Sequence, residues 1–194
     1  MVSPNIEKMY WGRPLQDNPV GEYRPHEALI EAVASRLMPS GRALVLSNDD
    51  GIDALYMAQS GYAVALVGLF PGEVEIARQR IAETDARVQV YSAEPTKMPF
   101  HPGEFDVVFD PRVYNALKGE ERALFIKELH RITRPGGYIV FVVPSYKSSP
   151  PGCMTKEAAV SAFQPPFEVL SVVDIGGLEG EGFLSQYSVT LRRP

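Results

Sequence analysis

Two acidic side chains follow the first apolar run of the sequence, in the segment Ser47-Asn48-Asp49-Asp50-Gly51. Adjacent carboxylates at the end of a buried strand suit Mg²⁺ or Mn²⁺, because both ions prefer oxygen ligands. Any metal bound by this chain is therefore expected within coordination distance of Asp49 or Asp50. Carboxylates just before a helix also accept hydrogen bonds from its first N–H groups, so the same residues suit a cap for a helix that begins at Ile52. The residue types leave both roles open.

A second group of reactive side chains, Asp110, Arg112 and Tyr114, follows the apolar run Phe105–Phe109. An aspartate at a strand end can hold a substrate proton, an arginine can pair with an anionic group, and a tyrosine can stack or form a hydrogen bond. These three are the predicted catalytic residues. The alternative is an Asp110–Arg112 salt bridge that fixes the loop.

The elements that position these residues alternate between short apolar runs and amphipathic stretches. Strands are expected at 43–46, 62–67, 88–91, 105–109, 138–143, 167–173 and 185–191, and helices at 27–37, 52–60, 72–82, 119–133 and 155–163. Such alternation is typical of βαβ units and a parallel sheet. The last two strands are joined by the glycine-rich loop 176–182, so they are expected to pair antiparallel.

Length and composition indicate one α/β domain at residues 27–194, preceded by an N-terminal arm or lid at 1–26. The net charge of -5 disfavours nucleic acid as a partner and favours a small-molecule substrate. A single cysteine excludes an internal disulfide and a multi-cysteine zinc site. No run of about 18 apolar residues occurs, so we expect a cytoplasmic protein outside the membrane. The oligomeric state does not follow from the sequence.

A family resemblance rests on Phe105–Asp110 and on the later run Leu129–Gly137, which contains Arg134-Pro135-Gly136-Gly137. These segments resemble strands four and five of the class I S-adenosylmethionine (SAM)-dependent methyltransferases, and Gly61–Val64 with Pro71–Arg78 resembles strand two and its helix. Pro135 is expected to end the helix, and the two glycines permit positive φ in the turn back into the sheet. The resemblance implies a doubly wound, seven-stranded, mostly parallel sheet in the order 3-2-1-4-5-7-6.

More narrowly, the chain resembles the thiopurine S-methyltransferase group. The resemblance rests on the aromatic pair Tyr10-Trp11, on Asp110-Pro111-Arg112 and on Pro150-Pro151-Gly152. It implies that Trp11 covers the cofactor cleft and that His26 lines the pocket.

The resemblance also implies SAM as cofactor, but the residues that would bind it depart from the family pattern. The family carries Gly-x-Gly-x-Gly after strand one, where this chain has Ser47, Asn48, Asp49, Asp50 and Gly51. The acid that accepts the ribose hydroxyls is replaced by Gly68, followed by Leu69, and Glu94 matches the family's adenine-contacting acid. The lost hydrogen bonds and the crowded turn predict SAM binding that is about 10²–10⁴-fold weaker, or lost.

These residues are consistent with three alternative functions. The first is a SAM-dependent methyltransferase that acts on a small molecule, and the second is a non-catalytic methyltransferase fold that binds another ligand or partner. The third is a metal-dependent phosphatase, because Leu46–Ile52 resembles the metal-binding opening of the survival protein E nucleotidases. SAM binding discriminates the first two, and a response to Mn²⁺ discriminates the third.

Overall fold

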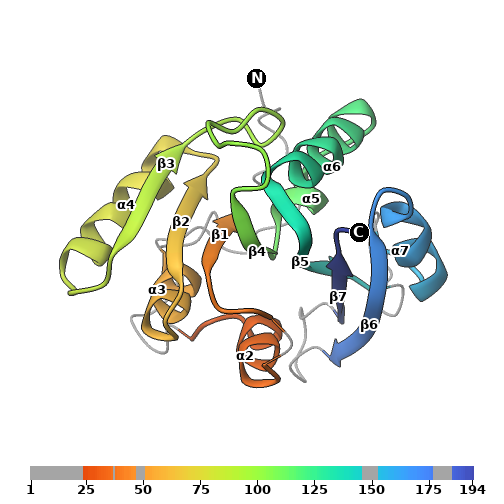
Figure 1. Ribbon diagram of the computed structural model, residues 1–194, viewed down its shortest axis with the longest axis horizontal. Coiled ribbons are helices and arrows are strands. Elements are labelled where there is room, and N and C mark those ends of the chain that lie inside the picture. Colours follow the sequence, from red (N-terminus) through yellow and green to blue (C-terminus); the bar gives the residue numbers. More distant parts are fainter. Residues whose placement is uncertain (1–23, 37, 47–50, 146–152, 177–184) are drawn as a thin grey trace.

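A computed structural model describes residues 24–36, 38–46, 51–145, 153–176 and 185–194. Within these ranges, one seven-stranded sheet has the order β3-β2-β1-β4-β5-β7-β6, as predicted (Figure 1). The predicted arm at 1–26 lies almost entirely outside the described residues. The strands are β1 (Arg42–Leu46), β2 (Ala63–Gly68), β3 (Val88–Ser92), β4 (Phe105–Asp110), β5 (Thr133–Pro144), β6 (Glu168–Gly176) and β7 (Gln186–Arg192).

The strand directions also match the prediction. The pairs β1–β2, β1–β4, β2–β3 and β4–β5 are parallel, whereas β7 is antiparallel to both β5 and β6. Strand β1 is central, and its last four residues are fully buried because helices cover both faces of the sheet.

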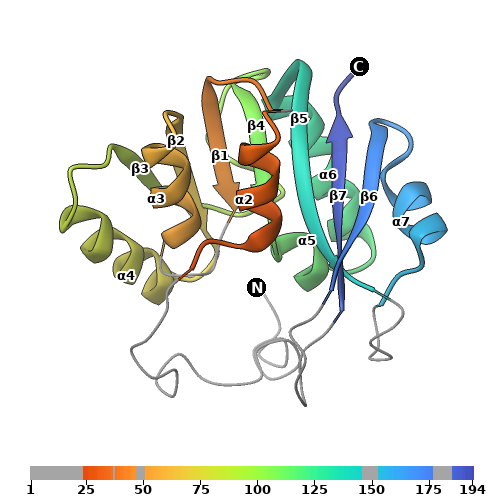
Figure 2. The same ribbon diagram turned by 90° about the horizontal axis from the view of Figure 1, so that it is seen from below.

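Helices pack on both faces of the sheet (Figures 1 and 2). One apolar core lies beneath α2, α3 and α4, and a second lies beneath α5, α6 and α7. The helices are α2 (Glu27–Ala34), α3 (Ile52–Gln59), α4 (Pro71–Ala82), α5 (Val113–Ala116), α6 (Glu120–Ile132) and α7 (Lys156–Phe163). None of the helices in the described ranges is long and apolar enough to cross a membrane.

Two helix predictions needed correction. Helix α2 was expected to reach Leu37 but ends at Ala34, because Arg36 adopts a φ of 54°, which a right-handed helix does not accept. The short helix α5 was missed, since four residues are too few to show a helical period.

The turn between α6 and β5 differs from the prediction in its details. Helix α6 ends at Ile132, three residues before Pro135, and β5 begins at Thr133. Gly136 uses the permitted positive φ, at 74°, whereas Gly137 has no positive φ. A Cβ on Gly137 would lie 2.9 Å from the Arg134 carbonyl oxygen, so this glycine is required for space. The two glycines therefore serve different purposes.

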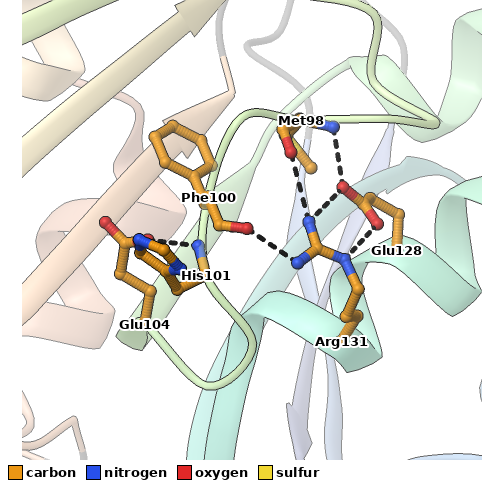
Figure 3. A network of polar contacts seen from close by, with 6 residues as sticks. All are labelled: Met98, Phe100, His101, Glu104, Glu128 and Arg131. Carbon is orange, nitrogen blue, oxygen red and sulfur yellow. Dashed lines mark hydrogen bonds and ion pairs between the residues drawn. The ribbon is translucent and has the colours of Figure 1, made fainter.

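The crossover from β3 to β4, residues 93–104, contains no helix and instead buries Met98 and Phe100 in the core. Two side chains of helix α6, Glu128 and Arg131, form hydrogen bonds with the backbone of this crossover, as Figure 3 shows. The Met98 N–H donates to Glu128 Oε1 at 2.7 Å, and Arg131 donates to the carbonyl oxygens of Phe100 and Met98 at 2.7 and 3.1 Å. Arg131 also forms an ion pair with Glu128 at 2.7 Å. We call Glu128, Arg131 and their partners Met98 and Phe100 the crossover clamp.

Candidate functional site

The carboxyl ends of the parallel strands meet at one edge of the sheet, where β1 separates β2 from β4. Leu46 pairs with Val67 of β2, and Val45 pairs with Phe109 of β4. The chain leaves β1 toward α3 on one face and leaves β4 toward α5 on the other. Ligands of open α/β sheets bind at such a reversal of strand order. The candidate site therefore lies beyond the ends of β1, β2 and β4.

Gly51 is the described residue of the predicted cofactor turn. It is buried, has a φ of 87° and occupies the N-cap position of α3. A Cβ at this position would lie 3.3 Å from the Cβ of Ala77, so α4 packs directly against it. Glycine is thus required at position 51 because the backbone adopts a positive φ and because α4 packs closely against α3 there. Trp11, Ser47, Asn48 and Asp49, predicted to bind the cofactor, lie outside the described residues.

The end of β2 carries no acidic side chain. Gly68 is the buried last residue of this strand and pairs with Ser92 of β3, and the half-buried Leu69 packs against the core. Glu94 is exposed in a turn in which the Lys97 N–H donates to the Glu94 carbonyl oxygen at 3.0 Å. The described residues therefore fit SAM in part: the sheet edge and Gly51 are in place, whereas the end of β2 offers no carboxylate for ribose hydroxyls.

Asp110 ends β4 and is fully buried, with an exposed fraction of 0%. Its Oδ1 accepts the N–H groups of Arg112 at 2.9 Å and Val113 at 2.6 Å, and its Oδ2 accepts that of Tyr114 at 2.9 Å. The carboxylate thus holds the first turn of α5 and presents no exposed oxygen to a substrate in this conformation. Burial raises the pKa of Asp110 to about 6, although the three N–H groups oppose the shift.

The other two predicted catalytic residues lie on opposite sides of this turn. Arg112 is exposed, and its backbone N–H donates to Asp110 Oδ1. Tyr114 is buried, with its ring centroid 5.5 Å from that of Phe141 and 4.9 Å from that of Phe163. Burial raises the pKa of Tyr114, against the nearby charge of Arg122. The structure brings the three residues into one turn but gives their side chains different surroundings.

A buried carboxylate that the sequence analysis did not consider lies beside the candidate site. Asp53, in the first turn of α3, is 3% exposed and accepts the His26 N–H at 2.7 Å. His26 in turn caps α2, because its Nδ1 accepts the Ala28 N–H at 3.3 Å. Asp53 thereby ties the start of α2 to the start of α3. The sequence signal for it was an acid in the first turn of a helix, which also occurs in exposed helices.

The described residues contain no group of three or more His, Cys, Asp or Glu side chains that could hold a metal ion. Asp49 and Asp50, on which the metal hypothesis rests, lie outside these residues. The metal hypothesis therefore stays a prediction.

Comparison with known proteins points to one family. Residues 48–141 match the family model described as a methyltransferase domain. An uncharacterized methyltransferase of Synechocystis is 31% identical over 122 residues, which cover 63% of this chain and 55% of the relative. The chain thus spans about half the length of this relative. A probable thiol methyltransferase of Arabidopsis thaliana is 24% identical over 160 residues, covering 78% of this chain and 69% of the relative.

A solved structure has the same fold. The 1,6-didemethyltoxoflavin N1-methyltransferase of Burkholderia thailandensis, whose crystal structure holds 1,6-didemethyltoxoflavin and S-adenosylhomocysteine, superposes with a TM-score of 0.71 at 17% identity. The match covers 86% of this chain and 76% of that one. In its sheet order, in the matched family model and in these relatives, the chain is similar to the class I SAM-dependent methyltransferases.

Proposed function

We propose that this protein is a methyltransferase that transfers the methyl group of SAM to a small molecule and binds SAM with reduced affinity. One observation carries the proposal: the family match begins at the exit of β1 and ends in β5, so it spans the edge at which β1, β2 and β4 end. When bound there, SAM supplies a methyl group activated on a sulfonium, and the protein contributes mainly the alignment of the acceptor.

A small acceptor is favoured by charge and by similarity. The net charge of -5 gives no basic field for a nucleic-acid backbone. The Arabidopsis relative is named for thiols and the Burkholderia enzyme for 1,6-didemethyltoxoflavin, which is a small molecule. We extend this substrate class, without a particular acceptor, to the present chain.

Within the turn after β4, we assign different roles to the three predicted catalytic residues. Arg112 is exposed and is proposed to pair with an anionic group of the acceptor. Asp110 is proposed as a positioning residue, since its carboxylate holds the N–H groups of Arg112 and Tyr114. Tyr114 packs between Phe141 and Phe163 and supports the turn from inside.

Reduced SAM affinity is proposed from the end of β2, where Gly68 occupies the position of the family's ribose-binding acid, and from the substituted turn at 47–51. Calorimetric titration of the full chain with SAM and with S-adenosylhomocysteine measures this directly. The triple variant Ser47→Gly, Asp49→Gly, Gly68→Asp is expected to bind SAM at least about tenfold more tightly than the natural sequence, since each restored interaction contributes about 1–3 kcal/mol.

A matched control is Gly72→Asp, which adds a carboxylate near the start of α4, where a Cβ would meet nothing within 4 Å. This variant is expected to leave SAM affinity unchanged. Tight SAM binding by the natural sequence would refute the reduced affinity while supporting an active methyltransferase. Absence of binding even in the triple variant would refute the enzyme proposal and favour a non-catalytic protein with a reshaped cleft.

A further inference from the structure

A groove of about 490 Å³ lies between α6 and the end of α7. Helix α6 forms one wall, and Ala162 with Pro165 and Pro166 forms the other. Tyr114 borders the groove from the side of α5. This volume is within the range of small-molecule sites in proteins, about 300–1,000 Å³. Apart from Tyr114 in the turn after β4, the described lining comes from α6 with the preceding Gly119 and from the end of α7, so the groove is distinct from the edge at which β1, β2 and β4 end.

The ionisable side chains that α6 contributes to the groove are basic. Among the residues that the structure describes, Arg122, Lys127 and His130 line the groove from α6, and no Asp or Glu lies in the lining. Arg122 and His130 are eight residues apart, two turns along one stripe of the helix, and Lys127 lies on the adjacent stripe. The three side chains therefore face the same groove in a chain whose net charge is -5. This local reversal of charge favours an anionic ligand.

Arg122 is held in place by Tyr114. Its Nε donates to the Tyr114 carbonyl oxygen at 3.2 Å, and its guanidinium carbon lies 4.8 Å from the centroid of the Tyr114 ring. Among the residues that the structure describes, the other guanidinium nitrogens have no hydrogen-bond partner. A guanidinium fixed in this way offers two adjacent N–H groups to a carboxylate or phosphate with little loss of side-chain entropy.

The two other basic side chains differ in character. His130 is half-buried, with its ring centroid 5.7 Å from that of Phe167. Burial, together with the charge of Arg193, lowers the pKa of His130, so at neutral pH it offers a neutral imidazole. Lys127 is exposed and adds a mobile positive charge. The groove thus combines one fixed cation, one flexible cation and one neutral imidazole.

The remaining wall is apolar, with Ile126 on α6 facing Ala162, Pro165 and Pro166. An inorganic ion would leave this surface in contact with water, whereas an organic ligand would cover it. We propose that the groove binds a small organic anion, a carboxylate or phosphate monoester with an apolar body, whose charged group pairs with Arg122 and Lys127. This site is additional to the proposed methyltransferase function and does not depend on it.

The test uses phenyl phosphate as probe, added to the ¹⁵N-labelled full chain. Saturable shifts are expected in the backbone amide signals of Ala123, Lys127 and Ala162. The double variant Arg122→Gln, Lys127→Gln is expected to weaken binding at least about tenfold, because it removes the two cations that pair with the phosphate. The control variant Arg78→Gln, Lys97→Gln removes the same charge from exposed positions outside the groove and is expected to bind like the natural sequence.

Thermal melting of both variants confirms that each is folded before its affinity is compared. Three results would overturn the proposal. The first is no saturable shift up to about 10 mM phenyl phosphate. The second is equal binding by uncharged benzyl alcohol, which would show an apolar groove without anion recognition. The third is tighter binding of a hexaglutamate peptide at the same amides, which would identify an acidic polypeptide as the ligand.

Discussion

Two buried carboxylates, Glu128 in the crossover clamp and Asp110 in the turn after β4, have the same chemical group in different surroundings. Glu128 accepts one backbone N–H group, that of Met98, and Asp110 accepts three, those of Arg112, Val113 and Tyr114. Glu128 also faces the Arg131 guanidinium at 2.7 Å. For Asp110, the contacts recorded with the described residues are the backbone N–H groups alone. The main difference between the two sites is the arginine.

The deeper burial of Asp110 and the guanidinium beside Glu128 together decide the direction in which each pKa moves. Burial alone would raise the pKa of Glu128, but the hydrogen bond from Arg131, the Met98 N–H and the charge of Arg131 together lower it. At Asp110, burial outweighs three backbone N–H groups, and the pKa rises to about 6. Backbone N–H groups therefore complete the hydrogen bonding of a buried carboxylate, but they do not offset the full free-energy cost of burying its charge.

The largest expected effect comes from the clamp. Glu128→Gln keeps the shape of the side chain but leaves Arg131 without its counter-charge, so we expect a loss of about 3 kcal/mol in the free energy of unfolding at pH 7. This is the lower end of the usual range for breaking a buried pair, because the Arg131 side chain is 35% exposed. Urea denaturation measures the loss. Glu121→Gln, exposed on the same helix, is the control, and an equal loss in both variants would contradict the role of the pair.

A smaller effect is expected when the crossover clamp keeps a positive charge at position 131 but loses the planar guanidinium. Arg131→Lys retains a cation beside Glu128 but cannot reach the carboxylate and the Phe100 and Met98 carbonyl oxygens together, so we expect a loss of about 2 kcal/mol. Hydrogen exchange of the Met98 amide should accelerate in this variant. Arg78→Lys on exposed α4 is the control. If Arg131→Lys leaves both stability and exchange unchanged, the clamp depends on charge alone.

The smallest expected effect tests the raised pKa of Asp110. The folded protein binds a proton at this carboxyl with a pKa of about 6, above the ordinary value of 3.8, so lowering the pH through this interval stabilises the natural sequence. Relative to Asp110→Asn, the natural sequence should therefore gain about 1 kcal/mol in unfolding free energy between pH 7 and pH 5.

Urea denaturation of both proteins at a series of pH values measures this gain. Relative to Glu128→Gln, the natural sequence is expected to show the opposite trend, a loss of unfolding free energy as the pH falls. The lowered pKa of Glu128 gives a stabilisation that is present above pH 4.5 and is lost as the pH falls through the folded pKa. A difference between the natural sequence and Asp110→Asn that stays constant from pH 7 to pH 5 would show that the Asp110 pKa is not raised.

Much of the architecture followed from local patterns in the sequence. The apolar runs around Ala43 and Phe105 and the amphipathic stretches between them predicted the strands and helices, since side chains repeat every two residues in a strand and every 3.6 in a helix. The resemblance around Arg134–Gly137 gave the strand order. The site was predictable to the level of the turn after β4, because a residue that follows a parallel strand lies at the ligand-binding edge.

The surroundings of the individual side chains were decided by the tertiary structure alone. Glu128 meets Met98 across 30 residues of sequence, and Gly137 is required because the Arg134 carbonyl oxygen and the Asp106 carbonyl oxygen occupy the space of a Cβ. Asp110 was predicted to hold a substrate proton, a role that stays a prediction, and packing buries its side chain completely. Periodicity reports which face of an element is apolar, whereas burial and partner choice depend on which distant elements cover that face, and these are fixed only when the chain has packed.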